Sequence, residues 1–80
     1  MNEQKKIAER IKQLCQEKQF SYYLLAYKAA VPITTLMNIL HSNTKNPGVL
    51  TLAKICDGLG ITIQDFFDAE MFKDIENETE

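Results

Sequence analysis

The segment 21–41, SYYLLAYKAAVPITTLMNILH, constrains the fold more than any other part of the chain. Ser21 is a favourable helix N-cap, because its hydroxyl can accept a hydrogen bond from an otherwise unpaired backbone N–H. Apolar residues then recur at helical spacing as far as Ala29, and the run breaks before Pro32, which cannot continue a helix but can begin another. A second run with helical periodicity follows, up to His41. The segment therefore predicts two short helices joined by a tight corner.

Each of these helices is too short to be stable alone, since isolated helices below about 12 residues are marginal in water. They must therefore pack against each other and against the rest of the chain. Two helices joined by a short turn form the helix-turn-helix arrangement, whose second helix can enter the major groove of DNA.

The length and composition are those of one small folded domain. The chain has 80 residues, of which 45% are hydrophobic, so wholesale disorder is not expected. No apolar run approaches the roughly 20 residues of a membrane-spanning helix, and the charged start MNEQKKIAER lacks the apolar segment of a signal peptide. We therefore expect a cytoplasmic protein that does not enter a membrane.

Two cysteines and one histidine are the residues to consider for metal chemistry. Cys15 and Cys56 each fall in a helical apolar stripe, which predicts buried, reduced thiols; a disulfide would require the two helices to meet there. The chain has no CxxC pair and no Cys/His cluster, and His41 stands alone near a helix end. We expect no metal site and no cofactor.

The net charge of −2 hides an uneven distribution. Residues 1–64 carry eight Lys and Arg against four Asp and Glu, whereas residues 65–80 carry one against seven. A mildly basic body followed by an acidic end is compatible with a nucleic-acid partner.

Three further helices flank the central unit. Apolar spacing predicts helices over 3–18 and 49–59, with Gly60 in the left-handed position after the second. Thr62 and Asp65 have the spacing of a capping box and predict the start of a short fifth helix. No strand-like alternation extends beyond a few residues, so the predicted class is all-α.

Residues 69–80 are predicted to form an acidic extension, partly helical and then frayed, after a domain over 1–68. Its apolar residues allow two interpretations: they cover the core, or they form a patch for another chain. These residues are Met71, Phe72 and Ile75.

The ordered set LLAYKAAVPITTLMNI, then NP, then LTLAKICDGLGITIQDFF resembles the phage repressor and Cro type of helix-turn-helix domain, the XRE family. The resemblance covers roughly residues 5–68. It implies a compact five-helix repressor-like DNA-binding domain, here with a short C-terminal helical extension. It also implies binding to a double-stranded DNA operator, usually as a homodimer.

The chain departs from the family pattern at several positions. Ala30 and Ser42 stand where the family often has Gly; if Ala30 is left-handed, it costs on the order of 1 kcal/mol. Cys15 and Leu40 stand where many members have a buried Arg–Glu pair, and replacing both partners of such a pair by apolar residues is often neutral or stabilising. We predict that Cys15 and Leu40 lie in contact.

The outward side of the second helix supplies the predicted base contacts. If Leu36 and Ile39 point inward, the residues left facing a groove are Ile33, Thr34, Met37 and Asn38. Asn38 could form a bidentate contact to adenine, and Ile33 could pack on a thymine methyl group or, alternatively, staple against the preceding helix. The presence of Thr34 and Thr35 is explained equally well by the residue preferences of the first turn of a helix, without a contact to DNA.

The predicted phosphate contacts rest mainly on the resemblance. It implies that Ser21 and Tyr22, at the start of a helix, and the loop residues Asn43, Thr44 and Lys45 clamp phosphates; helix N-termini bind anions well. Two further candidates are Lys28, on the exposed side of its helix, and Thr35. Tyr22, Tyr23 and Tyr27 could form an aromatic surface, but we expect at least Tyr23 or Tyr27 in the core.

Together these features predict a sequence-specific DNA-binding transcriptional regulator, a repressor, that places helix 33–41 in the major groove of an inverted-repeat operator. The resemblance favours the fifth helix and the tail as the dimer surface. The alternative is a protein-interaction or antitoxin-like module on the same fold, which the acidic tail and the uncharged second helix favour. We expect no enzyme, because the chain has one His, no nucleophile paired with a base and no phosphate-binding loop.

Overall fold

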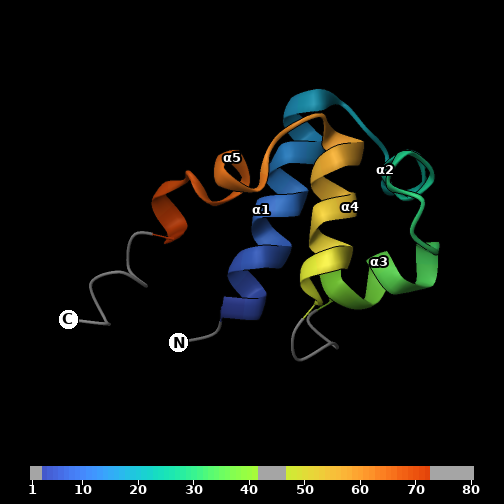
Figure 1. Ribbon diagram of the computed structural model, residues 1–80, viewed down its shortest axis with the longest axis horizontal. Helices are drawn as coiled ribbons and strands as arrows, with labels where there is room; N and C mark the ends of the chain where they lie inside the picture. Colours follow the sequence, from blue (N-terminus) through green and yellow to red (C-terminus); the bar gives the residue numbers. More distant parts are fainter. Residues whose placement is uncertain (1–2, 42–46, 73–80) are drawn as a thin grey trace.

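The computed structural model describes residues 3–41 and 47–72. Across these residues the regular structure is helical, which confirms the all-α prediction. The elements are α1 (Glu3–Lys18), α2 (Tyr22–Ala29), α3 (Ile33–Leu40), α4 (Val49–Leu59), α5 (Ile63–Phe67) and the 3-10 turn η1 (Glu70–Phe72). Figure 1 shows α1 and α4 in the middle of the molecule, α2 and α3 at one end, and α5 at the other.

Helix α1 has the bounds that its apolar stripe predicts. Its inward side buries Ile11, Leu14 and Cys15, and it packs against α3 and α4. The chain leaves the helix through Gln19, whose φ of 59° is left-handed, and the Phe20 N–H donates to the Cys15 carbonyl at 2.9 Å. Phe20 then packs against the core, as its position before the Ser21 cap suggests.

The corner between α2 and α3 forms where the sequence places it. The Ser21 hydroxyl accepts from the Leu24 N–H at 3.0 Å, which confirms the N-cap. Ala30 ends α2 in the left-handed conformation, with φ 57° and ψ 43°. The Val31 N–H donates back to the Ala26 carbonyl at 3.0 Å, which satisfies a carbonyl that the helix end would otherwise leave unpaired. Pro32 follows at φ −57° and opens α3.

Helices α2 and α4 approach each other closely at Gly58. A Cβ placed on Gly58 would lie 2.8 Å from the Ala29 backbone N, which is too short for a real contact. The glycine therefore permits the approach, although it weakens the last turn of α4. Gly60 ends α4 at φ 76°, the left-handed position that the sequence predicts.

Helix α5 begins at the predicted capping box. The Thr62 hydroxyl accepts from the Asp65 N–H at 3.0 Å, and the Asp65 carboxylate accepts from the Thr62 N–H at 3.5 Å. Arg10 of α1 holds the other end of α5, where its guanidinium donates to the Phe66 carbonyl at 2.6 Å and to the Asp65 carbonyl at 2.8 Å. This link between elements distant in the sequence was not predicted.

The extension folds back onto the core as far as Phe72. Phe72 is buried, and its ring centroid lies 4.9 Å from that of Phe67 and 6.1 Å from that of Phe66. Met71 is partly buried against the same core. The first of the two interpretations of the extension is thus confirmed for Met71 and Phe72, while Ile75 lies outside the described residues.

One hydrophobic core joins all the elements. Cys15 and Leu40 are both members of it, and α1 packs against α3, but their direct contact stays a prediction. Both cysteines are buried free thiols, as expected. No described helix is long and apolar enough to cross a membrane.

Candidate nucleic-acid interface

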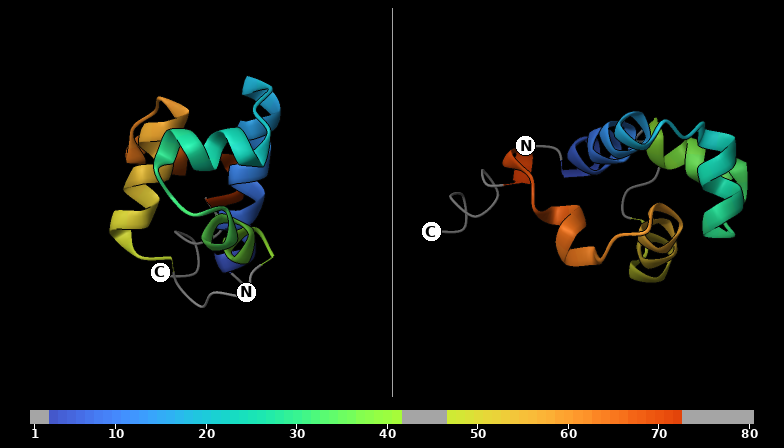
Figure 2. Two further views of the ribbon diagram at one scale, coloured as in Figure 1. Left: turned by 90° about the vertical axis from the view of Figure 1, so that its right-hand side faces the viewer. Right: turned by 90° about the horizontal axis from the view of Figure 1, so that it is seen from above.

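Helix α3 has one buried side and one exposed side. Leu36 is fully buried, and Ile39 and Leu40 are nearly so. Because residues three and four apart share a helix side, these three anchor α3 on the core and leave Thr34 and Asn38 exposed. Figure 2 (left) shows α2 crossing the end of the molecule with α3 below it, both at the surface.

The four predicted base-facing residues fall into two pairs. Thr34 and Asn38 are exposed and lie four residues apart on the outer side of α3. Ile33 and Met37 are half-buried and pack against the core, so they form the edge of this surface. A staple of Ile33 against α2 stays a prediction, and a part of the Ile33 side chain remains accessible.

The predicted phosphate contacts are spread over two helices: Ser21 and Tyr22 lie at the start of α2, Lys28 in its last turn and Thr35 in α3. Ser21 and Lys28 are exposed, and Tyr22 and Thr35 are half-buried. The Ser21 hydroxyl is engaged as the α2 cap, and the Lys28 ammonium lies 5.5 Å from the centroid of the Phe20 ring. Asn43, Thr44 and Lys45 lie outside the described residues.

A groove of about 550 Å³ connects α1, the start of α2 and α3. Its lining includes Lys12 from α1, Ser21 and Tyr22 from the α2 N-terminus, and Met37 from α3. The groove therefore belongs to the same surface as the predicted phosphate contacts. Burial raises the pKa of the Cys15 thiol, which also lines the groove, so the thiol stays neutral there.

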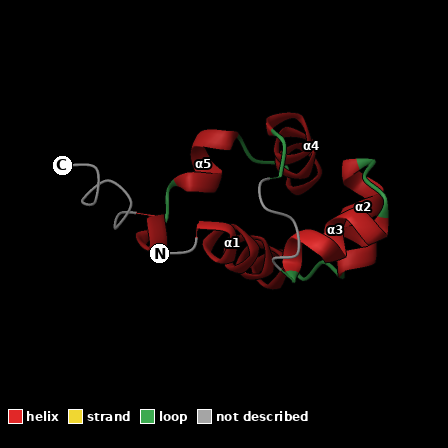
Figure 3. Ribbon diagram, turned by 90° about the horizontal axis from the view of Figure 1, so that it is seen from below, coloured by secondary structure: helices red, strands yellow, loops and turns green. Residues whose placement is uncertain are grey.

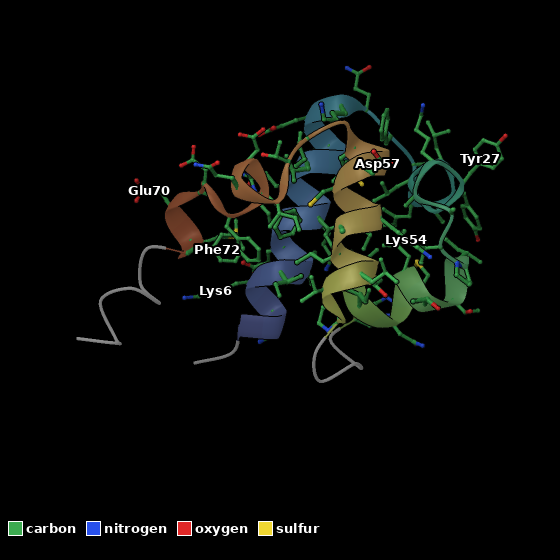
Figure 4. All side chains as sticks on the ribbon, in the orientation of Figure 1. Lys6, Tyr27, Lys54, Asp57, Glu70 and Phe72 are labelled. Atoms are coloured by element: carbon green, nitrogen blue, oxygen red, sulfur yellow. The ribbon has the colours of Figure 1, made fainter. Side chains whose placement is uncertain are left out.

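The expectation that Tyr23 or Tyr27 lies in the core is wrong. Their side chains are 75% and 83% exposed. Helix α2 buries Leu25 and Ala29, which lie on the opposite side of this short helix. The two tyrosines therefore form an outward aromatic pair at a spacing of four residues, and Figure 4 shows Tyr27 pointing away from the molecule.

Sequence reasoning missed two charged residues of α1. Arg10 binds the end of α5, a contact that the helical periodicity of α1 does not predict. Lys6 is only 9% exposed, and its ammonium has no hydrogen-bond partner among the residues that the structure describes. Neither lies at the α2–α3 end, and a helical wheel cannot show which neighbouring element covers them.

The described residues hold no group of three or more His, Cys, Asp or Glu side chains that could bind a metal ion. Among the described residues, the α2–α3 end offers exposed hydroxyls, the Asn38 amide, the Lys28 ammonium and the α2 N-terminus. Such a set can form hydrogen bonds to base edges and phosphates.

Comparisons with known proteins identify the family of the chain. The family profile of the Cro/C1-type HTH DNA-binding domain matches residues 10–71. Among solved structures, the chain is similar to the wild-type restriction-modification controller protein C.Esp1396I, with TM-score 0.75, 30% identity, and coverage of 89% of this chain and 87% of that chain.

Two point mutants of that controller protein are also similar. One gives TM-score 0.78 and 26% identity, covering 96% of both chains. The other gives TM-score 0.76 and 27% identity, covering 96% of this chain and 94% of that chain. A search among curated protein sequences found no match. With the family profile spanning most of its length, the chain belongs to the Cro/C1-type helix-turn-helix DNA-binding family and is a DNA-binding transcriptional regulator.

Proposed function

We propose that this regulator is a sequence-specific repressor that places α3 in the major groove of a double-stranded operator. The observation that carries the proposal is the division of α3: three aliphatic side chains fix it to the core, and Thr34 and Asn38 remain exposed on the other side. An exposed helix of this size fits the major groove, where an amide can pair with adenine and a hydroxyl with several bases.

The start of α2 is proposed to bind the DNA backbone beside that groove. Its N-terminus carries the positive end of the helix dipole, and Ser21 and Tyr22 lie there. Lys28 supplies the cation on the same helix. The side chain of Thr35, also proposed to contact phosphate, lies at the edge of α3.

The operator is proposed to be an inverted repeat that binds a homodimer. Helix α3 has no charged side chain, so one protomer can read few bases. Two half-sites about one DNA turn apart double both the base contacts and the phosphate contacts. The similarity to restriction-modification controller proteins supports the further proposal that the regulated genes belong to such a system.

Selection of bound duplexes from a random library tests the proposal. We expect enrichment of an inverted repeat whose half-sites are centred about one helical turn apart. The full chain should be used with Thr34→Ala and Asn38→Ala as variants, because both side chains are exposed and their loss leaves the core intact. Failure to enrich any sequence over bulk DNA at low salt would overturn specific recognition.

A protein-interaction module on the same fold is the second candidate. The exposed pair Tyr23 and Tyr27 favours it, since tyrosines are enriched where protein interfaces form. A pull-down with Tyr23→Ser/Tyr27→Ser against the wild-type chain tests this candidate. For either candidate we propose a non-enzymatic protein of the cytoplasm.

A further inference from the structure

The solvent side of α4 is an apolar and charged strip with no partner in the described chain. Val49 and Leu50 are 79% and 70% exposed, more than any other large aliphatic side chain in the described part of the chain. Lys54 and Asp57 continue on the same side, because Leu50, Lys54 and Asp57 follow at intervals of four and three residues. We call Leu50, Lys54 and Asp57 the α4 strip.

The charges of the α4 strip are not neutralised within the molecule. Neither Lys54 nor Asp57 forms an ion pair over residues 3–41 and 47–72. Both project from α4 in Figure 4. The opposite side of α4 buries Leu52, Ile55, Cys56 and Leu59 in the core, so the α4 strip faces directly away from the protein.

We infer that the α4 strip is the surface on which a second copy of this chain docks, with the two α4 helices antiparallel about a two-fold axis. This inference rests on the proposed homodimer and names its surface. In such a pairing Lys54 of each copy faces Asp57 of the other, so the strip is complementary to itself. Isologous contacts of this kind are the commonest way in which proteins form dimers.

The apolar ends of the strip fit the same arrangement. With Lys54 opposite Asp57, Leu50 lies opposite position 61 of the second copy. Ile61 is half-buried there, and the neighbouring Ile63 side chain at the start of α5 is 39% exposed. Leu50 and Val49 of one copy thus reach an apolar end of the other, which includes part of α5.

The position of α4 also suits two-fold binding to DNA. In Figure 2 (left), α2 and α3 face the viewer and α4 runs along their side. A two-fold axis along that line of sight, beside the α4 strip, turns a second copy so that its α2 and α3 also face the viewer. Figure 3 shows α5 at the far end from α2 and α3, so α4 rather than α5 flanks the recognition unit.

Charge reversal provides a sharp test, with sedimentation equilibrium of the full chain as the measurement. We expect Lys54→Asp and Asp57→Lys each to weaken self-association roughly tenfold or more, because each places two like-charge contacts in the interface. An equimolar mixture of the two variants should form heterodimers, and the double variant Lys54→Asp/Asp57→Lys should regain the wild-type dissociation constant. Lys18→Asp and Glu17→Lys, exposed on α1, are the matched controls and should leave it unchanged.

Leu50→Glu tests the apolar end independently of the charges. It should give monomers at concentrations where the wild-type chain is dimeric, while circular dichroism shows unchanged helicity. If all these variants associate as the wild-type chain does while Phe67→Glu is monomeric, the dimer interface is on α5 and not on the α4 strip. A wild-type chain that remains monomeric, with and without DNA, would also overturn it.

Failure of the proposed function has a different signature. Binding of a single half-site duplex by the Leu50→Glu monomer measures base recognition without dimerisation. A monomer that still prefers the selected half-site supports recognition by α3 whatever the association data show. If the wild-type chain binds the selected half-site no better than other duplexes, the proposed function is refuted, and the sedimentation result on the dimer surface still stands.

Discussion

Ala30 adopts a left-handed conformation that the fold requires, although this conformation is unfavourable for alanine. The corner between α2 and α3 needs a left-handed residue, and Ala30 adopts φ 57° without the freedom of glycine. This left-handed residue turns the chain so that the Val31 N–H can donate to the Ala26 carbonyl. The sequence suggested this cost, and the backbone geometry confirms that the residue is left-handed.

Ala30→Gly should therefore raise the free energy of unfolding by about 1 kcal/mol, measured by urea denaturation, since glycine adopts positive φ without a Cβ penalty. Ala29→Gly, one residue earlier and helical, is the contrasting variant and should lower it, because it removes a buried methyl group and a helix-favouring residue. Equal effects of the two substitutions would contradict the account of the corner.

Lys6 is a second residue whose environment costs free energy. Its ammonium is buried and has no hydrogen-bond partner within residues 3–41 and 47–72, and it lies on the side of α1 towards Phe72 in Figure 4. Lys6→Met keeps the aliphatic stem and removes the charge, so we expect the free energy of unfolding to rise by about 1 kcal/mol or more.

The matched control for Lys6 is Lys12→Met, whose side chain is exposed. This control should change the free energy of unfolding by no more than about 0.5 kcal/mol. A loss of stability in Lys6→Met, relative to Lys12→Met, would show that the ammonium has a partner that stabilises the folded chain.

At the scale of elements, the contact between α2 and α4 depends on the missing side chain of Gly58. Gly58→Ala should lower the free energy of unfolding by about 1–3 kcal/mol, because the added Cβ meets the Ala29 backbone at 2.8 Å. This loss opposes the gain of about 1 kcal/mol that alanine brings to a helix interior. Gly48→Ala is the control, since a Cβ there has nothing within 4 Å; a stabilised Gly58→Ala variant would mean that α2 moves away freely.

The orientation of α5 depends on Arg10. Its guanidinium donates to two carbonyls at the end of α5 and to Gln13 at 2.7 Å. Arg10→Met should cost about 1.5–3 kcal/mol of stability, because hydrogen bonds from a charged donor are lost. Arg10→Lys should recover little of this, since an ammonium cannot reproduce the planar fork. Hydrogen exchange of the α5 amides should rise in both variants, and unchanged exchange would show that the core alone fixes α5.

At the scale of the whole molecule, local signals predicted the elements well. The bounds of α1 and α4, the Ser21 cap, the capping box at Thr62 and the left-handed Gly60 follow from short-range physical rules, and the structure confirms them. These features are recoverable because each depends on residues within about one helical turn.

Contacts between distant elements were harder to predict. The burial of Lys6, the link from Arg10 to α5 and the exposure of Tyr23 depend on how separate helices pack, and periodicity does not encode this packing. The candidate site was predictable in part: Thr34 and Asn38 are exposed, while Ile33 and Met37 lie at the edge because the core draws them inward. The roles of these residues on DNA remain predictions.

We expect operator recognition to depend on base contacts from the exposed side of α3. The most direct measurement is the affinity of the wild-type chain, Asn38→Ala and Lys28→Ala for a panel of all single-base variants of the selected operator. We predict that Asn38→Ala relaxes discrimination at one position of each half-site by about 1–3 kcal/mol, while Lys28→Ala weakens binding to every duplex alike and reduces its salt dependence. An Asn38→Ala chain with the wild-type pattern of preferences across the panel, or a Lys28→Ala chain that changes preference at one base pair, would contradict the account.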